Sequence, residues 1–379
     1  MAVKTKVLHA VFAVAFVLIL LTPLLFIDLT GNTVSVKENR TLAPLPAMTD
    51  ILHHPRLFIG QFDLWFSDHV GFREDSVSFY TKVEAIGTQR YRDGQYLYLI
   101  GQQGHVYFAG TDGQMIPKFQ GKSILTDEQL RNFAVELDKV KEYLDRNGIA
   151  FVIMLCADKE SIYPEFYPET IIRGPEPIQL ELVTAYLGEH TNVDVFNIRQ
   201  RLLVEKENFF VFNRSAGDLG HYNELGGFFA YHELMKHIHT NFPDVRPIEL
   251  NEVNISYDSD EIPTVSLKGY LPYQMLDARF FDNAIVNRPF SWENIAFENY
   301  NVSLPTILIM RDSYAAPEIF SKYLAQHFGK TILIHHRNMD HFTDYVQLYK
   351  PDIVVFEAAE RQLKSFSEHV SALQNVEIF

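Results

Sequence analysis

The fold is decided by the stretch Thr306-Ile-Leu-Ile-Met-Arg-Asp-Ser-Tyr314. Its first five residues carry no charge and do not alternate between polar and apolar side chains, which is typical of a strand buried on both faces of a sheet. A helix is predicted directly afterwards, over residues 315–327. Strand, tight turn and helix in this order form the unit from which α/β proteins are built. The serine of this stretch, Ser313, lies at the turn.

The same alternation of strand and helix recurs along the chain. Apolar runs predict further strands at residues 150–155, 192–197, 331–334 and 352–356. Helices are predicted at residues 225–240 and at residues 126–147, where the sequence Thr126-Asp-Glu-Gln129 can form a capping box. We therefore predict an α/β fold with a central, mainly parallel sheet flanked by helices.

The N-terminus has the composition of a membrane anchor. Lys4 and Lys6 precede an apolar stretch over residues 7–27. At about 1.5 Å per residue, a helix of that length spans roughly 30 Å, the thickness of the hydrocarbon core of a bilayer. The two lysines favour a cytoplasmic N-terminus. We predict one transmembrane helix, an uncleaved signal anchor in the cytoplasmic (inner) membrane, with the rest of the chain periplasmic or extracellular. A cleaved signal peptide is the alternative.

The remainder of the chain divides into a tether and one large domain. Residues 30–56 contain three prolines and little periodicity, which indicates an extended linker. We predict an anchor over residues 1–29, a linker over residues 30–56 and an α/β domain over residues 57–379.

Composition excludes some classes of function. The 379-residue chain carries a formal net charge of −15, which repels phosphate backbones and makes nucleic-acid binding unexpected. Its one cysteine, Cys156, forms no intramolecular disulfide and lies in an apolar run, so we predict a buried thiol. No nucleotide-binding glycine loop is present, and we expect no cofactor. The histidines and aspartate between His335 and His341 match no strong ligand spacing, and we predict no metal site.

Ser313 is the first candidate for catalysis. A serine at the turn after a buried strand is exposed beyond the carboxyl end of that strand. Backbone N–H groups at the start of the next helix can stabilise an oxyanion there. The alternative is that Ser313 only caps the helix.

A possible base lies in the stretch Gly217-Asp-Leu-Gly-His-Tyr-Asn223. A hydroxyl is a poor nucleophile at neutral pH unless a base removes its proton, and histidine suits this role. An aspartate can orient the imidazole and stabilise its positive charge. Asp218 precedes His221 by three residues, a spacing at which a tight loop can bring the two side chains together. The alternative is that Asp218 caps the following helix and His221 is a surface residue.

The two motifs together resemble the two halves of the SGNH (GDSL-like) hydrolase triad. Here Asp218 and His221 precede Ser313, an order that resembles the alginate O-acetyltransferase family of the AlgJ/AlgX type. Further segments fit the same family and extend the resemblance from about residue 36 to residue 363: Glu38-Asn-Arg-Thr-Leu-Ala-Pro-Leu-Pro46, Phe62-Asp-Leu-Trp-Phe-Ser-Asp-His-Val-Gly-Phe-Arg73, Lys159-Glu-Ser-Ile-Tyr-Pro-Glu165 and His221-Tyr-Asn-Glu-Leu-Gly-Gly227.

The resemblance implies an SGNH hydrolase-like three-layer sandwich and an O-acetyltransferase of exopolysaccharide biosynthesis. Ser313, activated by His221 and Asp218, would carry the acetyl group and pass it to a hydroxyl of an extracytoplasmic polysaccharide. The N–H of Ser313 would contribute to the oxyanion hole. The resemblance also implies a partner, an MBOAT-type membrane acyltransferase that relays the acetyl donor.

The chain departs from the family pattern beside both motifs. The family has Asp-x-His-Trp-Asn where this chain has Asp-x-x-His, and Tyr222 stands where tryptophan is common. Arg311 and Tyr314 replace the glycine and phenylalanine of Gly-Asp-Ser-Phe. Substrate-binding roles are predicted for Lys159, Arg311, Tyr314, Tyr222, Asn223 and Arg361. The alternatives are a solvated or salt-bridged Lys159 and a structural ion pair for Arg361.

Two other functions fit the same residues. An esterase would use the same triad with water as the acceptor, since transfer depends on excluding water from the acyl-enzyme. A non-catalytic subunit that binds the polymer in an acetylation complex would need no working triad.

Overall fold

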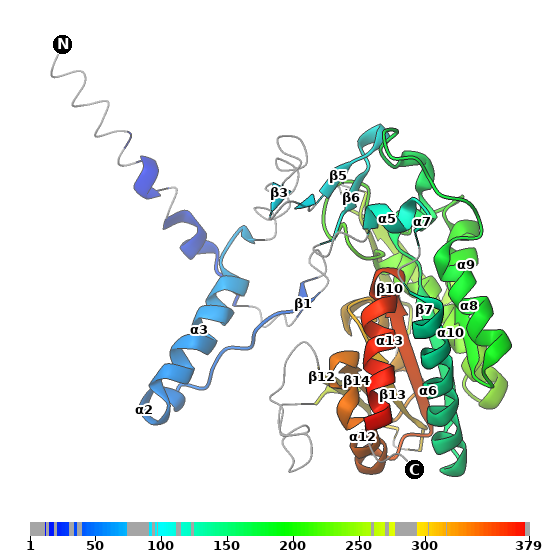
Figure 1. The fold of residues 1–379 in the computed structure, drawn as a ribbon. Helices are drawn as coiled ribbons and strands as arrows, with labels where there is room; N and C mark the ends of the chain where they lie inside the picture. The colour runs from blue at the N-terminus through cyan, green and yellow to red at the C-terminus, as the bar shows by residue number, and fades with distance from the viewer. Residues whose placement is uncertain are drawn as a thin grey trace, which may run out of the picture. The chain divides into compact units, whose positions relative to one another are not determined.

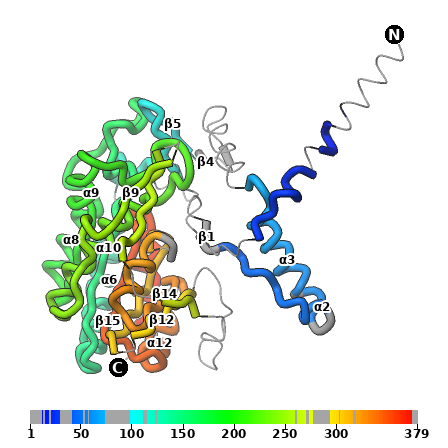
Figure 2. The backbone as a smooth tube through the Cα atoms, turned by 180° about the vertical axis from the view of Figure 1, so that it is seen from behind, coloured from blue at the N-terminus to red at the C-terminus, as the bar shows by residue number. Residues whose placement is uncertain are grey.

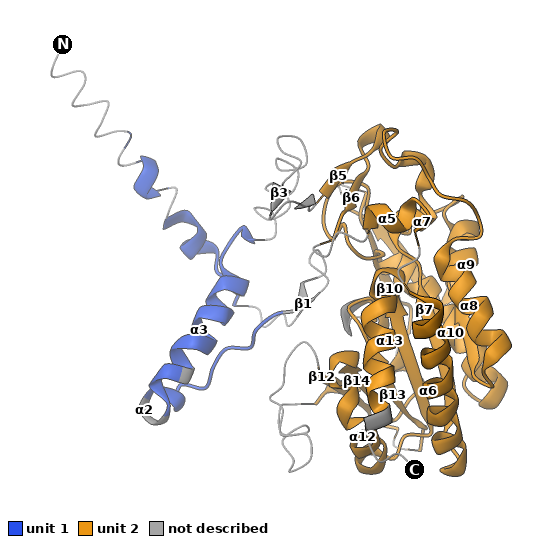
Figure 3. Cartoon of the chain, in the orientation of Figure 1, with its two compact units in different colours: residues 1–82 blue, residues 83–379 orange. Residues whose placement is uncertain are grey.

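The computed structural model describes residues 12, 15–18, 21–29, 34–35, 40–73, 91–92, 95–96, 98–110, 115–122, 125–258, 261–269, 273–276, 294–301, 303–315 and 317–375. The chain divides into two compact units, residues 1–82 and residues 83–379, which Figure 3 colours separately. The anchor, linker and domain boundaries proposed from the sequence stay predictions.

The first unit is built around one helix, α3 (Pro55–His69), which has a proline at its first position, where the missing N–H costs nothing. Its other elements are η1 (Thr22–Phe26), α2 (Asp50–His53) and the paired strands β1 (Val34–Ser35) and β2 (Arg40–Thr41). No helix among the described residues has both the length and the apolar character needed to cross a membrane. Much of the predicted anchor, residues 7–11, 13–14 and 19–20, lies outside the described residues.

A seven-stranded sheet forms the centre of the second unit. Its strands lie in the order β11 (Tyr273–Met275), β12 (Asn294–Asn299), β14 (Lys330–His335), β13 (Thr306–Arg311), β15 (Ile353–Ala359), β7 (Ala150–Cys156) and β8 (Asp194–Asn197). Neighbours from β14 to β8 are parallel, whereas β12 runs antiparallel to both of its neighbours. The prediction of an α/β fold with a mainly parallel sheet is confirmed.

The sheet order explains the apolar runs in the sequence. The strands β13, β15 and β7 lie in the middle of the sheet and are buried along nearly their whole length. A central strand covered on both faces has no solvated side, so its side chains do not alternate. Cys156, at the end of β7, is fully buried, as predicted.

Helices cover both faces of the sheet. Phe356 of β15 packs edge-on against Phe366 of α13 (Leu363–Ser371) and Phe342 of α12 (Phe342–Tyr349). Phe133 of α6 (Asp127–Arg146) joins the same aromatic cluster through Phe366. Figure 1 shows α6 and α13 in front of the strands, and Figure 2, from behind, shows α10 (Glu224–Asn241) on the other side.

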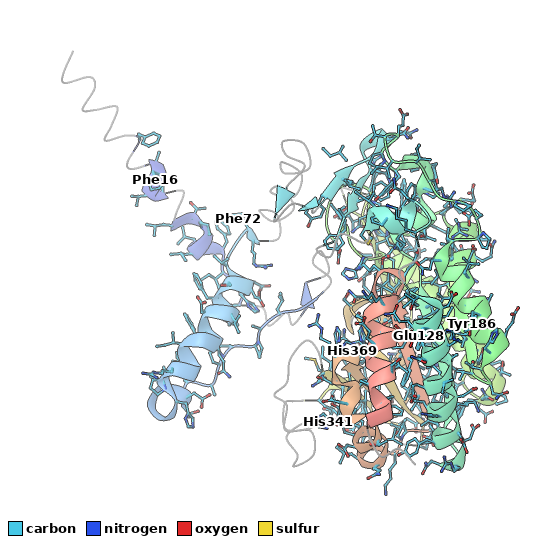
Figure 4. All side chains as sticks on the ribbon, viewed as in Figure 1. Phe16, Phe72, Glu128, Tyr186, His341 and His369 are labelled. Atoms are coloured by element: carbon cyan, nitrogen blue, oxygen red, sulfur yellow. The ribbon has the colours of Figure 1, made fainter. Side chains whose placement is uncertain are left out.

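The remaining described elements of this unit are short or peripheral. They are β3 (Tyr91–Arg92), β4 (Gln95–Tyr96), β5 (Tyr98–Ile100), η2 (Gln102–Gly104), β6 (Val106–Phe108), α5 (Met115–Phe119), α7 (Lys159–Ile162), η3 (Pro164–Phe166), α8 (Gln179–His190), α9 (Arg199–Glu205), η4 (Leu250–Glu252), β9 (Val253–Tyr257), β10 (Pro263–Leu267), η6 (Pro317–Ser321), α11 (Lys322–Leu324), η7 (His336–His341), η8 (Glu360–Gln362) and η9 (Ala372–Asn375). Tyr186, labelled in Figure 4, marks α8, and Glu128 marks the first turn of α6.

Two of the helices predicted from the sequence agree with the structure to different extents. The capping box of α6 is present, with Thr126 accepting from the N–H of Gln129 and Gln129 accepting from the N–H of Thr126. The helix predicted over residues 315–327 is, among the described residues, helical in the structure only over residues 317–324. There the π-helical turn η6 is followed by the three-residue helix α11. The helical turn begins at Pro317, a position at the start of a helix where the missing N–H of proline costs nothing.

Candidate active site

The turn after β13 is held by the residue before the serine. Asp312 accepts hydrogen bonds from the backbone N–H of Tyr314 and of Ala359, both at 2.7 Å, and its own N–H donates to Glu357 at 3.0 Å. These bonds tie the turn to the carboxyl end of the neighbouring strand β15. The side chain of Asp312, rather than that of Ser313, therefore accepts the backbone hydrogen bond at this turn. The hydroxyl of Ser313 is thus available to another partner.

The loop before α10 presents the histidine. Gly217 has a φ angle of 72°, in the left-handed region that favours glycine, at the entry to this loop. The carboxylate of Asp218 accepts from the N–H of Gly220 at 2.8 Å and from the N–H of His221 at 3.2 Å. Asp218 therefore shapes the loop on which His221 stands as well as contacting its ring.

Asp218, His221 and Ser313 form one hydrogen-bonded chain. Nδ1 of His221 lies 2.7 Å from Oδ2 of Asp218, and Nε2 lies 2.7 Å from Oγ of Ser313. A carboxylate only accepts, so Nδ1 carries the proton and Nε2 is the acceptor for the serine hydroxyl. The structure brings the three predicted residues together, although His221 and Ser313 are 92 positions apart in the sequence.

The carboxylate of Asp218 stays ionised at neutral pH. Burial acts to raise the pKa of Asp218, but the neighbouring His221, the hydrogen bond to it, the N–H of Gly220 and the charge of Arg361 together hold that pKa below its usual value. An ionised Asp218 can stabilise a positive charge on His221 when it takes up a proton.

Two predicted substrate-binding tyrosines pack inside the site. The hydroxyl of Tyr222 donates to the carbonyl of Tyr314 at 2.6 Å, and both side chains are fully buried. The ring of Tyr314 lies edge-on to the imidazole of His221, with centroids 5.1 Å apart. The two tyrosines join the histidine loop to the serine turn. Asn223 caps α10 instead of facing a ligand, accepting from the N–H of Leu225 and of Gly226.

The three predicted basic residues also have partners inside the protein. Lys159 donates to the carbonyls of Val106, Asn213 and Arg214 at 2.6, 2.6 and 3.0 Å, which matches the three donors of an ammonium group. Arg311 is 1% exposed and donates to the carbonyl of Asp312. Neither arrangement places the charge on an open face of the site.

Arg361 lies behind the histidine loop. Its guanidinium donates to the carbonyl of Gly220 and, at 3.1 Å, to Asp158, and it lies over the rings of Phe108 and Tyr314. It holds the loop between Asp218 and His221 in place. The structural ion pair expected as the alternative is present, with Asp158 as the partner.

Asp158 is the residue that sequence reasoning missed. It is fully buried, accepts from the hydroxyl of Tyr314 at 2.8 Å and contacts Lys118 at 2.5 Å. Burial acts to raise the pKa of Asp158, but Lys118 and Arg361 lower it further than burial raises it. One signal could have found it, because Asp158 lies two residues beyond the end of β7, and the carboxyl ends of parallel strands meet at one edge of a sheet.

Among the described residues, no three His, Cys, Asp or Glu side chains are grouped to hold a metal ion. The histidines near residue 335 make other contacts: Nδ1 of His336 lies 2.7 Å from Nδ1 of His369, on α13.

Comparison with known proteins returns similar structures but no similar sequences. No family model and no curated protein matches the chain. Similar solved structures include Bacillus cereus PatB1, at 14% identity over 62% of this chain and 90% of that chain, with a TM-score of 0.46. A DHHW family protein from Eubacterium siraeum is similar at 14% identity over 73% of this chain and 98% of that chain, with a TM-score of 0.48. The O-acetyltransferase domain of Pseudomonas putida AlgJ is similar at 13% identity over 72% of this chain and 98% of that chain, with a TM-score of 0.44. AlgJ is of the type that the sequence motifs resemble.

Proposed function

We propose that this protein is an SGNH-type O-acetyltransferase that moves an acetyl group onto a hydroxyl of an extracytoplasmic polysaccharide through an acetyl-serine intermediate. One observation carries the proposal: Asp218, His221 and Ser313 are linked by two hydrogen bonds of 2.7 Å in the order that a nucleophilic serine requires. A triad of this kind can perform several reactions. The order of the motifs, with Asp218 and His221 before Ser313, resembles that of O-acetyltransferases and therefore supports acetyl transfer.

In the first half of the reaction, Nε2 of His221 accepts the hydroxyl proton of Ser313 as Oγ attacks the acetyl carbonyl of the donor. Asp218 stabilises the imidazolium that results. Among the described residues, the N–H of Ser313 has no hydrogen-bond acceptor, and it lies beside the reacting oxygen, where it can donate to the oxyanion. The tetrahedral intermediate then expels the leaving group, which takes the proton from His221.

In the second half, a sugar hydroxyl takes the place of the leaving group. His221 removes its proton, the alkoxide oxygen attacks the acetyl carbon, and the bond from that carbon to Oγ of Ser313 breaks. The proton passes from His221 back to the serine. Water in place of the sugar gives the esterase reaction, so the acceptor decides between the two functions.

The setting of the enzyme is part of the proposal. An apolar stretch over residues 7–27 following two lysines supports an N-terminal anchor, and hence a site on the outer side of the cytoplasmic membrane. Acetyl groups reach that side only if another protein passes them across, and an MBOAT-type acyltransferase is the partner that the family resemblance implies.

Acetyl capture by a saccharide tests the proposal. The full chain, purified in a neutral detergent, is incubated with p-nitrophenyl acetate, with and without a de-acetylated oligosaccharide, and products are identified by mass spectrometry. We expect acetylated oligosaccharide from the wild type and from Ser303→Ala, an exposed serine in the loop before β13, and none from Ser313→Ala. If the added oligosaccharide does not lower the amount of acetate that is released, the result supports the esterase function. Equal background rates in all three proteins contradict catalysis and support the polymer-binding subunit.

A further inference from the structure

A cavity lies apart from the catalytic triad. It has a volume of about 250 Å³, and neither Asp218, His221 nor Ser313 lines it. It lies between the first turns of α6 and α8, the helices that Glu128 and Tyr186 mark in Figure 4. Most of its wall is apolar, with contributions from Phe119, Leu125, Leu130, Ile178, Leu182 and Val183. At roughly 30 Å³ per water molecule, the volume holds a small organic molecule.

The floor of this cavity is polar. Glu160, Ser161, Glu360 and Lys118 line it, and each of the four is at most 6% exposed. The ammonium of Lys118 lies 2.9 Å from Glu160 and 3.7 Å from Glu360, and it bonds Asp158 behind them. Glu360 accepts from the hydroxyl of Ser161 and from the N–H of Asp158, both through Oε2.

Glu160 is the least satisfied member of the floor. Within the described part of the chain, its carboxylate has one partner, the ammonium of Lys118, and Oε1 is buried without a well-directed hydrogen bond. A carboxylate accepts about four hydrogen bonds when it is fully satisfied. A buried carboxylate with so few partners is costly, and it faces the cavity.

The charges of the cluster do not balance. Asp158, Glu160 and Glu360 are three carboxylates, and Lys118 and Arg361 are the two cations paired with them. Fully ionised, the five groups sum to one negative charge in a buried place, and Asp127 and Arg173, the other charged residues that line the cavity, cancel each other. A proton or a bound cation must neutralise the remaining charge. In agreement, burial raises the pKa of Glu160 to about 7 and also raises the pKa of Glu360.

We propose that this cavity is a binding site for a small primary ammonium ion with an aliphatic body. The ammonium group occupies the floor beside Glu160 and supplies the missing hydrogen-bond donors, while the aliphatic part contacts the apolar wall. The proton that Glu160 holds in the empty protein leaves to solvent when the cation binds, so charge and protons balance. An anion would meet the carboxylates of Glu160 and Glu360, and a neutral alcohol would leave the excess charge in place.

The site touches the catalytic turn through one residue. Asp158, which bonds Lys118 at the floor of the cavity, accepts a hydrogen bond from Tyr314, the neighbour of Ser313. The inference does not depend on acetyl transfer, because the site, its ligand and its test involve none of the triad residues.

Calorimetric titration of the full chain tests the inference with three probes of the same length: n-butylammonium, 1-butanol and butyrate. We expect butylammonium to bind at least tenfold more tightly than either other probe. Glu160→Gln, which keeps the shape and removes the charge, should weaken butylammonium binding at least tenfold. Leu182→Trp should also prevent binding, because Leu182 lines the cavity, yet its side chain is 54% exposed and tolerates enlargement.

The two variants separate loss of the site from loss of the fold. Circular dichroism of both variants should match the wild type at the pH of the titration, and the melting temperature of Leu182→Trp should match as well, because this variant changes no buried group. Butylammonium binding that both variants retain, or no binding to the folded wild type, overturns the inference. Equal binding of 1-butanol also overturns it, because it removes the role of the charge.

Discussion

At the scale of single residues, hydrogen-bond donors and acceptors fix the role of each group in the candidate site. His221 has two ring nitrogens, one bound to a carboxylate and the other to a hydroxyl, both at 2.7 Å. The carboxylate assigns the proton to Nδ1, which makes Nε2 the only basic nitrogen facing Ser313. Asp218 therefore acts through His221.

Asp218→Asn tests that assignment. The amide of asparagine can donate to Nδ1, which shifts the ring proton to Nε2 and removes the base from Ser313. We expect kcat for acetyl release from p-nitrophenyl acetate to fall by about 10²- to 10⁴-fold, with an unchanged circular dichroism spectrum. Asp194→Asn is the matched control, because Asp194 contacts His237 in the same way, at 2.9 Å, on the protein surface. A loss of kcat in the control as large as in Asp218→Asn would contradict the role of Asp218.

Glu160 makes stability depend on pH. Its pKa is about 7 in the folded protein against an ordinary value of 4.5, so the folded state holds the proton more tightly. The stability it contributes is fully present below pH 4.5 and is lost as the pH rises through 7. Relative to Glu160→Gln, the wild type should lose at most about 3 kcal/mol of unfolding free energy between pH 4.5 and pH 8. Urea denaturation of both proteins across this range measures the difference, and a flat difference would contradict the buried proton.

At the scale of elements, close backbone contacts place α10 and the loop before it. A Cβ atom at Gly226 would lie 2.3 Å from the carbonyl oxygen of Val211, which belongs to the backbone and cannot move aside. Tyr222 pairs with Phe212 in an isolated β-bridge just ahead of the helix. Glycine at position 226 thus allows the start of α10 to approach this bridge, and the approach sets the position of His221.

Gly226→Ala is expected to separate the two elements. We predict a loss of about 1–3 kcal/mol in unfolding free energy, together with a lower kcat, because the histidine loop moves with the start of the helix. The control is Gly188→Ala in α8, where an added Cβ would meet nothing within 4 Å and alanine should stabilise by about 0.5–1 kcal/mol. Urea denaturation of both variants gives the comparison. Equal effects at the two positions would show that close approach at Gly226 is not required.

At the scale of the whole molecule, the sheet gathers distant segments at the carboxyl ends of its strands. Asp158 follows β7, Ser313 follows β13 and Arg361 follows β15, three strands that are neighbours in the sheet. The hydrogen bond from Tyr314 to Asp158 spans 156 positions of sequence. Parallel strands align their carboxyl ends, so the topology alone brings these residues to one edge.

The sequence allowed the central sheet to be predicted, because apolar runs are local signals. The three residues of the candidate triad could be predicted because two short motifs together resemble those of a known family. It did not reveal the partners of Lys159, Arg361 or Asp158. Those partners depend on which loops meet above the sheet, and backbone carbonyls such as that of Gly220 leave no trace in residue type. The change from the π-helical turn η6 to α11 was missed because hydrophobic spacing does not distinguish a π-helical turn from an α-helix.

The central claim is that Ser313 becomes acetylated. The most direct measurement is the intact mass of the full chain after brief exposure to p-nitrophenyl acetate and acid quenching, for the wild type and Ser313→Ala, with peptide mapping of any adduct. We expect one added acetyl group on wild-type Ser313 and none on the variant. An adduct of equal amount on both proteins, or turnover at equal rates with no adduct on Ser313, would contradict it.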